Sequence, residues 1–159
     1  MKKYLKLIGL LLIIIIIGSF IYSRFYSTSE IPNFEYKTIY DEKFTKDDIK
    51  KSAKKIVFIY FSCKCDNCKK IINDIEKFRK IQNQNQIILI TTEKDIKLIK
   101  NFVKYEELNE LKIPILVDNN NNFPSDFSLG TSIDLPKVMV FDENRKLSKQ
   151  INSLNKLNL

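Results

Sequence analysis

The stretch "IVFIYFSCKCDNCKK", residues 56–70, combines a buried-strand pattern with the three cysteines of the chain. Its first six residues, 56–61, form an unbroken run of β-branched and aromatic side chains, which is typical of a strand buried on both faces of a sheet. Cys63, Cys65 and Cys68 follow within six positions. From Cys68 onward the apolar residues recur at helical spacing. The cysteines are therefore predicted to lie where a central strand turns into a helix.

The segment after the motif predicts a strand–helix–strand unit. The helix is expected to run through about four turns, and the second strand is "IILIT", residues 87–91. Two buried strands joined by a helical crossover are expected to pair in parallel. The apolar positions that define the helix are Cys68, Ile71, Ile72, Ile75, Phe78 and Ile81.

The remainder of the chain continues the alternation. A second amphipathic helix is indicated by Ile96, Ile99, Phe102 and Val103. A short strand at 114–118, a helical turn within 123–130, and a tight antiparallel hairpin of strands 137–142 and 146–151 are expected after it. The predicted class is α/β with a mixed sheet.

Composition restricts the chemistry. The 159 residues include no histidine and only three cysteines, so a Ser-His-Asp or Cys-His catalytic pair and any His-ligated metal are excluded. An odd number of cysteines leaves at least one thiol unpaired or paired transiently. Nucleophilic chemistry in this chain must come from thiols or carboxylates.

Cys65 and Cys68 form a Cys-X-X-Cys pair, the spacing of a reversible disulfide at a helix start. Unpaired amides and the positive end of the helix dipole favour a thiolate there. Cys65 is therefore the predicted attacking thiol, and Cys68, one turn further on, is the predicted resolving thiol. Asp66 opposes the thiolate, whereas three lysines favour it. These are Lys64, Lys69 and Lys70.

Cys63 lies outside the pair and has three interpretations. It is a free thiol packed as a small hydrophobe, a second resolving thiol, or a third ligand beside Cys65 and Cys68 for Cu(I), which accepts thiolates. The packed free thiol is the favoured interpretation, and Cys63 is kept as a possible accessory thiol of the site. No resident metal or cofactor is expected.

The amino-terminal part predicts a membrane anchor. Residues 7–23 are 17 uncharged positions that would reach about 25 Å as a helix, near the hydrocarbon thickness of a bilayer. Lys2, Lys3 and Lys6 precede them and only Arg24 follows closely, so the amino terminus is expected in the cytoplasm and the remainder outside it.

The expected organisation is an anchor and linker at 1–29 and one domain at 30–159. A cleaved signal peptide is the alternative, because the small residues at 27–29 suit a cleavage site. The anchor is favoured since its apolar run is longer than a usual signal core and "RFY", residues 24–26, interrupts the approach to that site.

The net charge of +8 does not indicate nucleic-acid binding. Residues 31–159 carry 23 basic and 18 acidic side chains, and their lysines are spread along helices without interleaved aromatic residues. A solvated surface is the better interpretation. The asparagine run "DNNNN", residues 118–122, is interpreted as a polar loop.

With these features in place, the chain resembles the thioredoxin-like superfamily, and within it the membrane-anchored TlpA-like and AhpC/TSA (redoxin) branch. The resemblance covers residues 32–150. It rests on "CDNC" at 65–68, on the Pro32-Asn33-Phe34 lead-in, and on "IPILVDNNNNFPSDFSLGTSIDLPKVMVFDENRKL" at 113–147.

The resemblance implies a thioredoxin-like fold, a mixed sheet flanked by helices. It further implies a thiol–disulfide oxidoreductase that acts on exported proteins, as a reductant rather than an oxidant, fed by a membrane electron donor. In that family the proline before the penultimate strand is cis and faces the cysteines. The matching residue is Pro136, and the backbone of Leu135 before it is expected to pair with substrate.

The chain departs from the family pattern at two places that bear on function. The buried carboxylate that thioredoxins carry six residues before the first cysteine is Ile59, so the proton acceptor for Cys68 is unassigned. A thiol peroxidase acting through Cys65 is an alternative activity, but the Thr-X-X-Cys signature has Ser62 in place of threonine. A non-enzymatic Cu(I)-binding protein is the other alternative.

Overall fold

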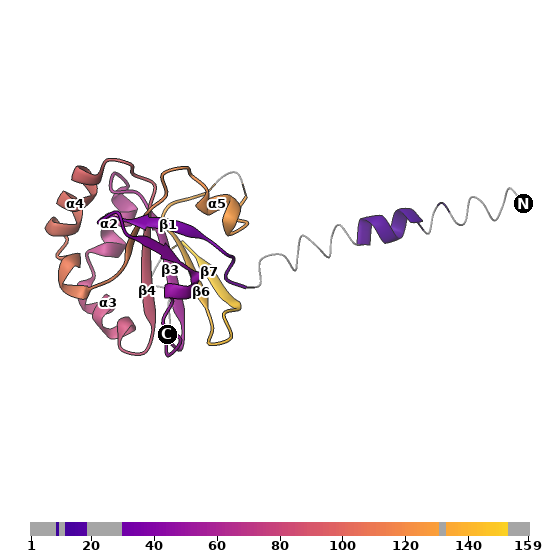
Figure 1. Cartoon of the computed structure of the whole chain (residues 1–159), viewed down its shortest axis with the longest axis horizontal. Helices are drawn as coiled ribbons and strands as arrows, with labels where there is room; N and C mark the ends of the chain where they lie inside the picture. The colour runs from indigo at the N-terminus through magenta and orange to yellow at the C-terminus, as the bar shows by residue number, and fades with distance from the viewer. Residues whose placement is uncertain (1–8, 10–11, 19–29, 131–132, 153–159) are drawn as a thin grey trace, which may run out of the picture.

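A seven-stranded mixed sheet forms the centre of the computed structural model, which describes residues 9, 12–18, 30–130 and 133–152 (Figure 1). The central strands β3 and β4 pair in parallel, as predicted, and β5 extends the parallel part. β6 pairs antiparallel with β3, and β7 with β6. The order across the sheet is β2 (Lys43–Thr45), β1 (Glu35–Thr38), β5 (Ile115–Val117), β4 (Gln86–Thr91), β3 (Ile56–Phe61), β6 (Lys137–Phe141) and β7 (Leu147–Ile151).

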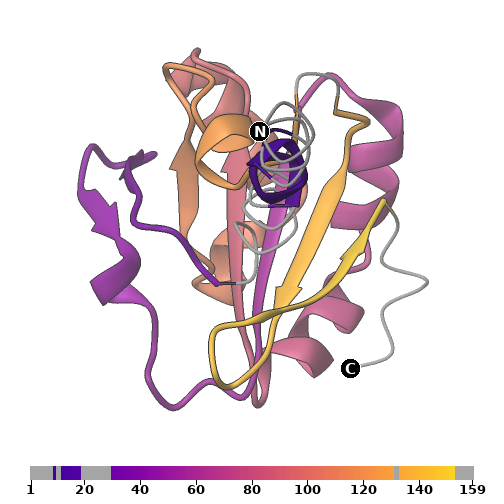
Figure 2. The same cartoon turned by 90° about the vertical axis from the view of Figure 1, so that its right-hand side faces the viewer.

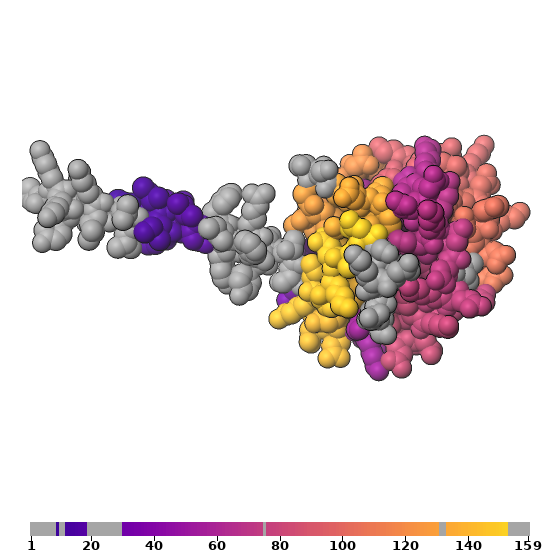
Figure 3. All heavy atoms as spheres, turned by 180° about the vertical axis from the view of Figure 1, so that it is seen from behind, coloured from indigo at the N-terminus to yellow at the C-terminus, as the bar shows by residue number. Residues whose placement is uncertain are grey.

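The helices cover the two faces of this sheet unequally. α2 (Asp66–Ile72), α3 (Ile75–Gln82) and α4 (Ile96–Tyr105) lie on one face, and the short α5 (Phe123–Asp126) lies on the other (Figures 1 and 2). Two 3-10 turns, η1 (Lys46–Asp48) and η2 (Leu108–Leu111), complete the connections. The strand β7, in yellow, lies at the molecular surface (Figure 3), whereas β6 is largely buried.

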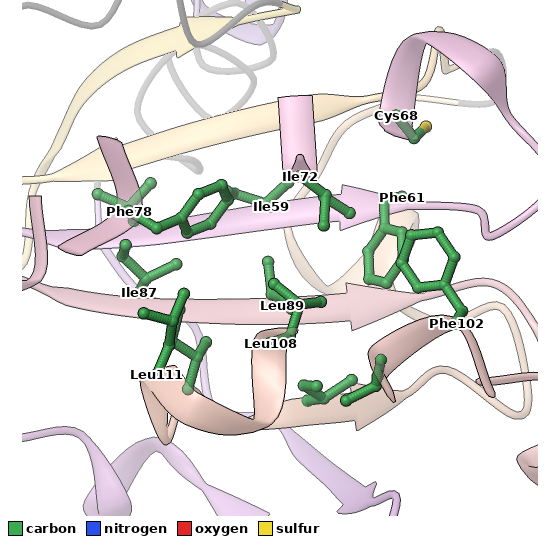
Figure 4. Close-up of a cluster of buried hydrophobic side chains, with 14 of the residues drawn as sticks. Ile59, Phe61, Cys68, Ile72, Phe78, Ile87, Leu89, Phe102, Leu108 and Leu111 are labelled. Atoms are coloured by element: carbon green, nitrogen blue, oxygen red, sulfur yellow. The ribbon is translucent and has the colours of Figure 1, made fainter. Parts of the chain in front are cut away.

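Strand β3 supplies both cores because all six of its residues are buried. Val57, Ile59 and Phe61 face α2, α3 and α4, and the alternate residues face α5. Figure 4 shows Cys68 at one end of the first core, beyond Phe61. The Cys68 thiol is thus part of the hydrophobic core. The second core is aromatic, built from Phe34, Tyr36, Phe44, Phe58, Tyr60, Phe123, Phe127 and Phe141.

The helix predicted to run unbroken from Cys68 to Ile81 is two helices, so that part of the prediction is wrong. α2 ends with Asn73 as its C-cap, and Asp74 caps α3 by accepting a hydrogen bond from the Lys77 amide over 3.1 Å. Side chains of Asn and Asp compete with helical backbone bonds and favour caps. The apolar spacing continues across the break, which is why periodicity alone did not reveal it.

The polar loop at 118–122 contains a structural residue that the sequence interpretation missed. Asp118 is only 1% exposed and accepts hydrogen bonds from the Tyr60 hydroxyl and from the amides of Asn122 and Phe123, at 3.0, 2.8 and 3.1 Å. These bonds start α5, which ends at Asp126 rather than near Gly130. A buried carboxylate with three donors is fully compensated.

The predicted anchor, residues 7–23, falls largely outside the described residues. Within it, residues 12–18 are helical, with exposed apolar side chains from Leu12 to Ile17. Among the residues that the structure describes, no helix meets the length and hydropathy needed to span a bilayer.

Candidate functional site

The Cys-X-X-Cys pair lies at the start of α2, at the carboxyl end of β3, as predicted. Cys65 is the N-cap residue, and its Sγ accepts a hydrogen bond from the amide of Cys68 over 3.2 Å. The amide of Cys65 in turn donates to the Ser62 carbonyl over 3.2 Å. Cys65 is partly buried and Cys68 is 0% exposed. The two thiols therefore differ in access although they are one turn apart.

Cys68 is held in its protonated form. Burial, with the Cys65 thiol as hydrogen-bond partner, raises the pKa of Cys68 to about 12 from an ordinary value of 9.0. A backbone hydrogen bond from Ser62 acts in the opposite direction without offsetting the burial. Cys68 in the dithiol state is thus a poor nucleophile.

Leu135 and Pro136 lie beside Cys65. The Leu135–Pro136 peptide bond is cis, which confirms the geometry that the resemblance implied. The Cys65 thiol points to the Leu135 carbonyl, with 3.7 Å between sulfur and oxygen. The structure therefore brings together Cys65, Cys68 and the Leu135 backbone, residues that are about 70 positions apart in the chain.

Ser62 and Glu93 also contact the motif, and neither was identified from the sequence as part of the redox site. Ser62 Oγ donates to Glu93 Oε1 over 2.8 Å, and Lys64 Nζ forms an ion pair with Glu93 Oε2 at 3.0 Å. Glu93 follows β4, and its side chain is only 12% exposed. Nothing in the sequence near Glu93 marks it, because the contact depends on the parallel pairing that aligns the ends of β3 and β4.

This ion pair changes one electrostatic argument made from the sequence. Lys64 was expected to favour the Cys65 thiolate directly, but its ammonium is paired with Glu93. Lys69 is likewise paired, with Asp66 Oδ1 at 3.3 Å. Both lysines therefore have a carboxylate partner next to the motif, which weakens their effect on the Cys65 thiolate.

Cys63 is buried beside Thr91. It is 5% exposed, and its Sγ is 3.9 Å from the Thr91 hydroxyl. Burial raises the pKa of Cys63 to about 11, and the Glu93 carboxylate adds to the effect. The residue also lines a cavity of about 570 Å³ that is bordered by residues of α2 and α4. These properties fit the interpretation of Cys63 as a packed free thiol.

The position of the family's buried carboxylate is apolar in the structure as well. Ile59 is 0% exposed within the core formed with α2, α3 and α4. Among the described residues, no three Cys, Asp or Glu side chains are grouped so that they could hold a metal ion.

A mixed sheet covered by α2, α3 and α4 on one face, with a Cys-X-X-Cys pair at the end of a central strand and a cis proline opposite, defines the thioredoxin-like class of oxidoreductases. The chain belongs to the Redoxin family, whose profile matches residues 27–157.

Solved structures support the fold. StoA from Bacillus subtilis is 18% identical, with a TM-score of 0.59 over 81% of this chain and 96% of that chain. A secreted Mycobacterium tuberculosis disulfide oxidoreductase homologous to E. coli DsbE is 14% identical, with a TM-score of 0.61 over 76% and 83% of the two chains. A thioredoxin-family thiol:disulfide interchange protein from Chlorobium tepidum is 16% identical, with a TM-score of 0.63 over 78% and 85%.

The comparison with curated proteins found no significant match. At identities of this order, the similarity to solved structures concerns the fold alone.

Proposed function

We propose that this protein is an extracytoplasmic thiol–disulfide oxidoreductase that exchanges disulfides with exported proteins through Cys65 and Cys68. The observation that carries the proposal is the position of the Cys65 sulfur. It accepts the Cys68 amide at 3.2 Å and lies 3.7 Å from the Leu135 carbonyl. An amide donor stabilises a thiolate, and the adjacent backbone offers an extended substrate a place to pair.

In the reducing direction the first step is attack by the Cys65 thiolate on a disulfide of the client. A bond forms between Cys65 Sγ and one client sulfur, the client S–S bond breaks, and the second client sulfur leaves as a thiolate. Cys65 is the suitable attacker because it is partly exposed while Cys68 and Cys63 are buried.

The second step releases the client. Cys68 loses its proton, and its thiolate attacks Cys65 Sγ, so that the Cys65–Cys68 disulfide forms as the mixed disulfide breaks. The proton passes to the departing client sulfur, the client thiolate released in the first step takes up a proton from water, and the client leaves with two thiols. The client has gained the two electrons that the protein pair has lost. A donor dithiol then restores the reduced pair.

The reducing direction, the membrane electron donor and the location are parts of the same proposal. The uncharged run at 7–23 and the exposed apolar side chains of residues 12–17 support the membrane location. The resemblance to TlpA-like proteins supports the reducing direction and the membrane electron donor. Among the solved structures of the same fold, the Mycobacterium tuberculosis protein is described as secreted.

Insulin reduction tests the proposed activity. Full-length protein in mild detergent, with dithiothreitol as electron source, is expected to accelerate precipitation of the insulin B chain, and Cys65→Ser is expected to give only the uncatalysed rate. The same preparation is assayed for hydrogen peroxide consumption. A wild-type protein without effect on insulin, or one that consumes peroxide instead, would overturn the proposal.

A further inference from the structure

The sequence contains no obvious determinant of the direction in which the Cys65–Cys68 pair transfers electrons. That direction depends on the reduction potential, which rises when the thiolate of the reduced form is stabilised. Charges close to the motif therefore change the reduction potential. One pair of such charges is formed by Glu93 and Lys64. The Glu93 carboxylate contacts Ser62 and Lys64, the residues on either side of Cys63.

Ser62 links Glu93 to both members of the redox pair. Its carbonyl accepts from the Cys65 amide at 3.2 Å, and its backbone acts to lower the pKa of the Cys68 thiol, against the larger effect of burial. Its hydroxyl accepts from the Lys64 amide at 3.1 Å while donating to Glu93 at 2.8 Å. The loop that positions the two thiols is thus fixed to the end of β4 through one side chain.

Glu93 also holds the ammonium of Lys64, the residue immediately before Cys65. A free lysine there would stabilise the Cys65 thiolate and make the pair more oxidising. Paired with Glu93 at 3.0 Å, its charge is compensated, and the carboxylate itself disfavours a second negative charge nearby. Both effects act in the same direction.

We infer that Glu93 is a positioning residue that lowers the reduction potential of the Cys65–Cys68 pair by holding Lys64 in an ion pair beside the motif. The inference rests on the proposed function, since it concerns the same pair, and it favours the reducing direction. Because the two charges compensate each other, the sign of the change in reduction potential can be predicted for the removal of either one.

The potential is measured on full-length protein equilibrated in glutathione buffers of graded ratio, with free thiols alkylated and the Cys65–Cys68 disulfide quantified by peptide mass. Glu93→Gln keeps an acceptor for Ser62 but removes the charge. It is expected to lower the equilibrium constant for oxidation by about threefold to tenfold, where tenfold corresponds to about 30 mV towards a more oxidising pair.

Two further variants isolate the charge. Lys64→Gln/Glu93→Gln removes both charges and is expected to return close to the wild-type ratio. Glu110→Gln removes a carboxylate from the surface ion pair with Arg79, between α3 and η2, and is expected to leave the ratio unchanged. Because the Lys64 side chain is 73% exposed, about 1 M salt should shrink the difference between Glu93→Gln and wild type.

The inference is overturned if Glu93→Gln has the wild-type ratio or shifts it towards the disulfide. It is also overturned if the double variant is shifted as far as Glu93→Gln, since the effect would then not pass through Lys64. Failure of the proposed function is distinguishable, because these ratios report on the pair itself and need no client.

Discussion

The amide of Cys68 donates a hydrogen bond to the sulfur of Cys65 over 3.2 Å, so the backbone of Cys68 supports the Cys65 sulfur while the Cys68 thiol itself stays in the core. The short helix α2 achieves this because Cys65 caps it and Cys68 follows in its first turn. One pair of residues thus combines an accessible sulfur and a protected sulfur.

This asymmetry predicts an order of alkylation. In reduced full-length protein near neutral pH, iodoacetamide should modify Cys65 first, because it is partly exposed. Cys63 and Cys68 should react far more slowly, since both are buried and their pKa values are raised to about 11 and about 12. Peptide mass spectrometry after timed quenching measures the three rates separately.

The pH dependence follows from the same values. Below its pKa, a thiol gains about tenfold in thiolate for each pH unit, so labelling of Cys63 and Cys68 should rise by about that factor per unit between pH 7 and 9 without a plateau. A plateau for Cys68 near neutrality, or labelling of Cys68 ahead of Cys65, is incompatible with the assigned roles.

Removing the Asp118 carboxylate should destabilise the fold. Asp118→Ala leaves the Tyr60 hydroxyl and the amides of Asn122 and Phe123 without their acceptor in a buried setting. A loss of about 3 kcal/mol in the free energy of unfolding is expected. Denaturant unfolding followed by circular dichroism provides the measurement.

Asp142 offers a matched control in the β6–β7 turn. It also accepts two backbone amides, from Asn144 and Lys146 at 2.9 Å each, but it is not buried. Asp142→Ala should cost only about 1 kcal/mol because water can replace the acceptor. Equal losses in the two variants would show that burial of Asp118 does not matter.

Membrane association is predicted from the amino-terminal run. Sodium carbonate washing should leave the full-length protein in the membrane fraction, with its carboxyl terminus accessible to protease added from outside. Ile14→Lys/Ile15→Lys places two charges within the run, each costing about 3 kcal/mol in the bilayer, and should release the protein. Ile14→Leu/Ile15→Leu is the conservative control. A soluble form beginning near Glu30 would instead indicate a cleaved signal.

Cys63 should be dispensable for turnover. It is buried against Thr91 and belongs to no Cys-X-X-Cys pair, so Cys63→Ser is expected to retain at least about half of the insulin-reducing rate. If this variant were as inactive as Cys65→Ser, a mechanism using three thiols would replace the two-thiol account.

Much of the fold could be predicted because local pattern and tertiary environment agree. The run at 56–61 is buried on both faces, and the helical spacing of Ile99, Phe102 and Val103 places these side chains in one core. The break at Asn73 and Asp74 could not be predicted from apolar spacing, because it depends on capping by a single side chain.

Some residues of the site could be predicted from the sequence and others could not. Cys65 and Cys68 could be identified from their spacing at a predicted strand-to-helix junction, whereas Pro136 was identified only through the family resemblance. Glu93 was not identified, since its contact with Ser62 arises only when β3 and β4 end side by side. Asp118 was interpreted as part of a polar loop because neighbouring asparagines concealed its burial.

The most direct test of the account is to trap the intermediate. In Cys68→Ser, attack by Cys65 can proceed but resolution cannot, so mixed disulfides should accumulate with exported client proteins and appear on nonreducing gels as bands of higher mass that vanish with reductant. Mass spectrometry should place the linkage at Cys65, and Cys65→Ser/Cys68→Ser should show no such bands. Absence of mixed disulfides in Cys68→Ser, or their persistence through Cys63 in the double variant, would contradict disulfide exchange by the Cys65–Cys68 pair.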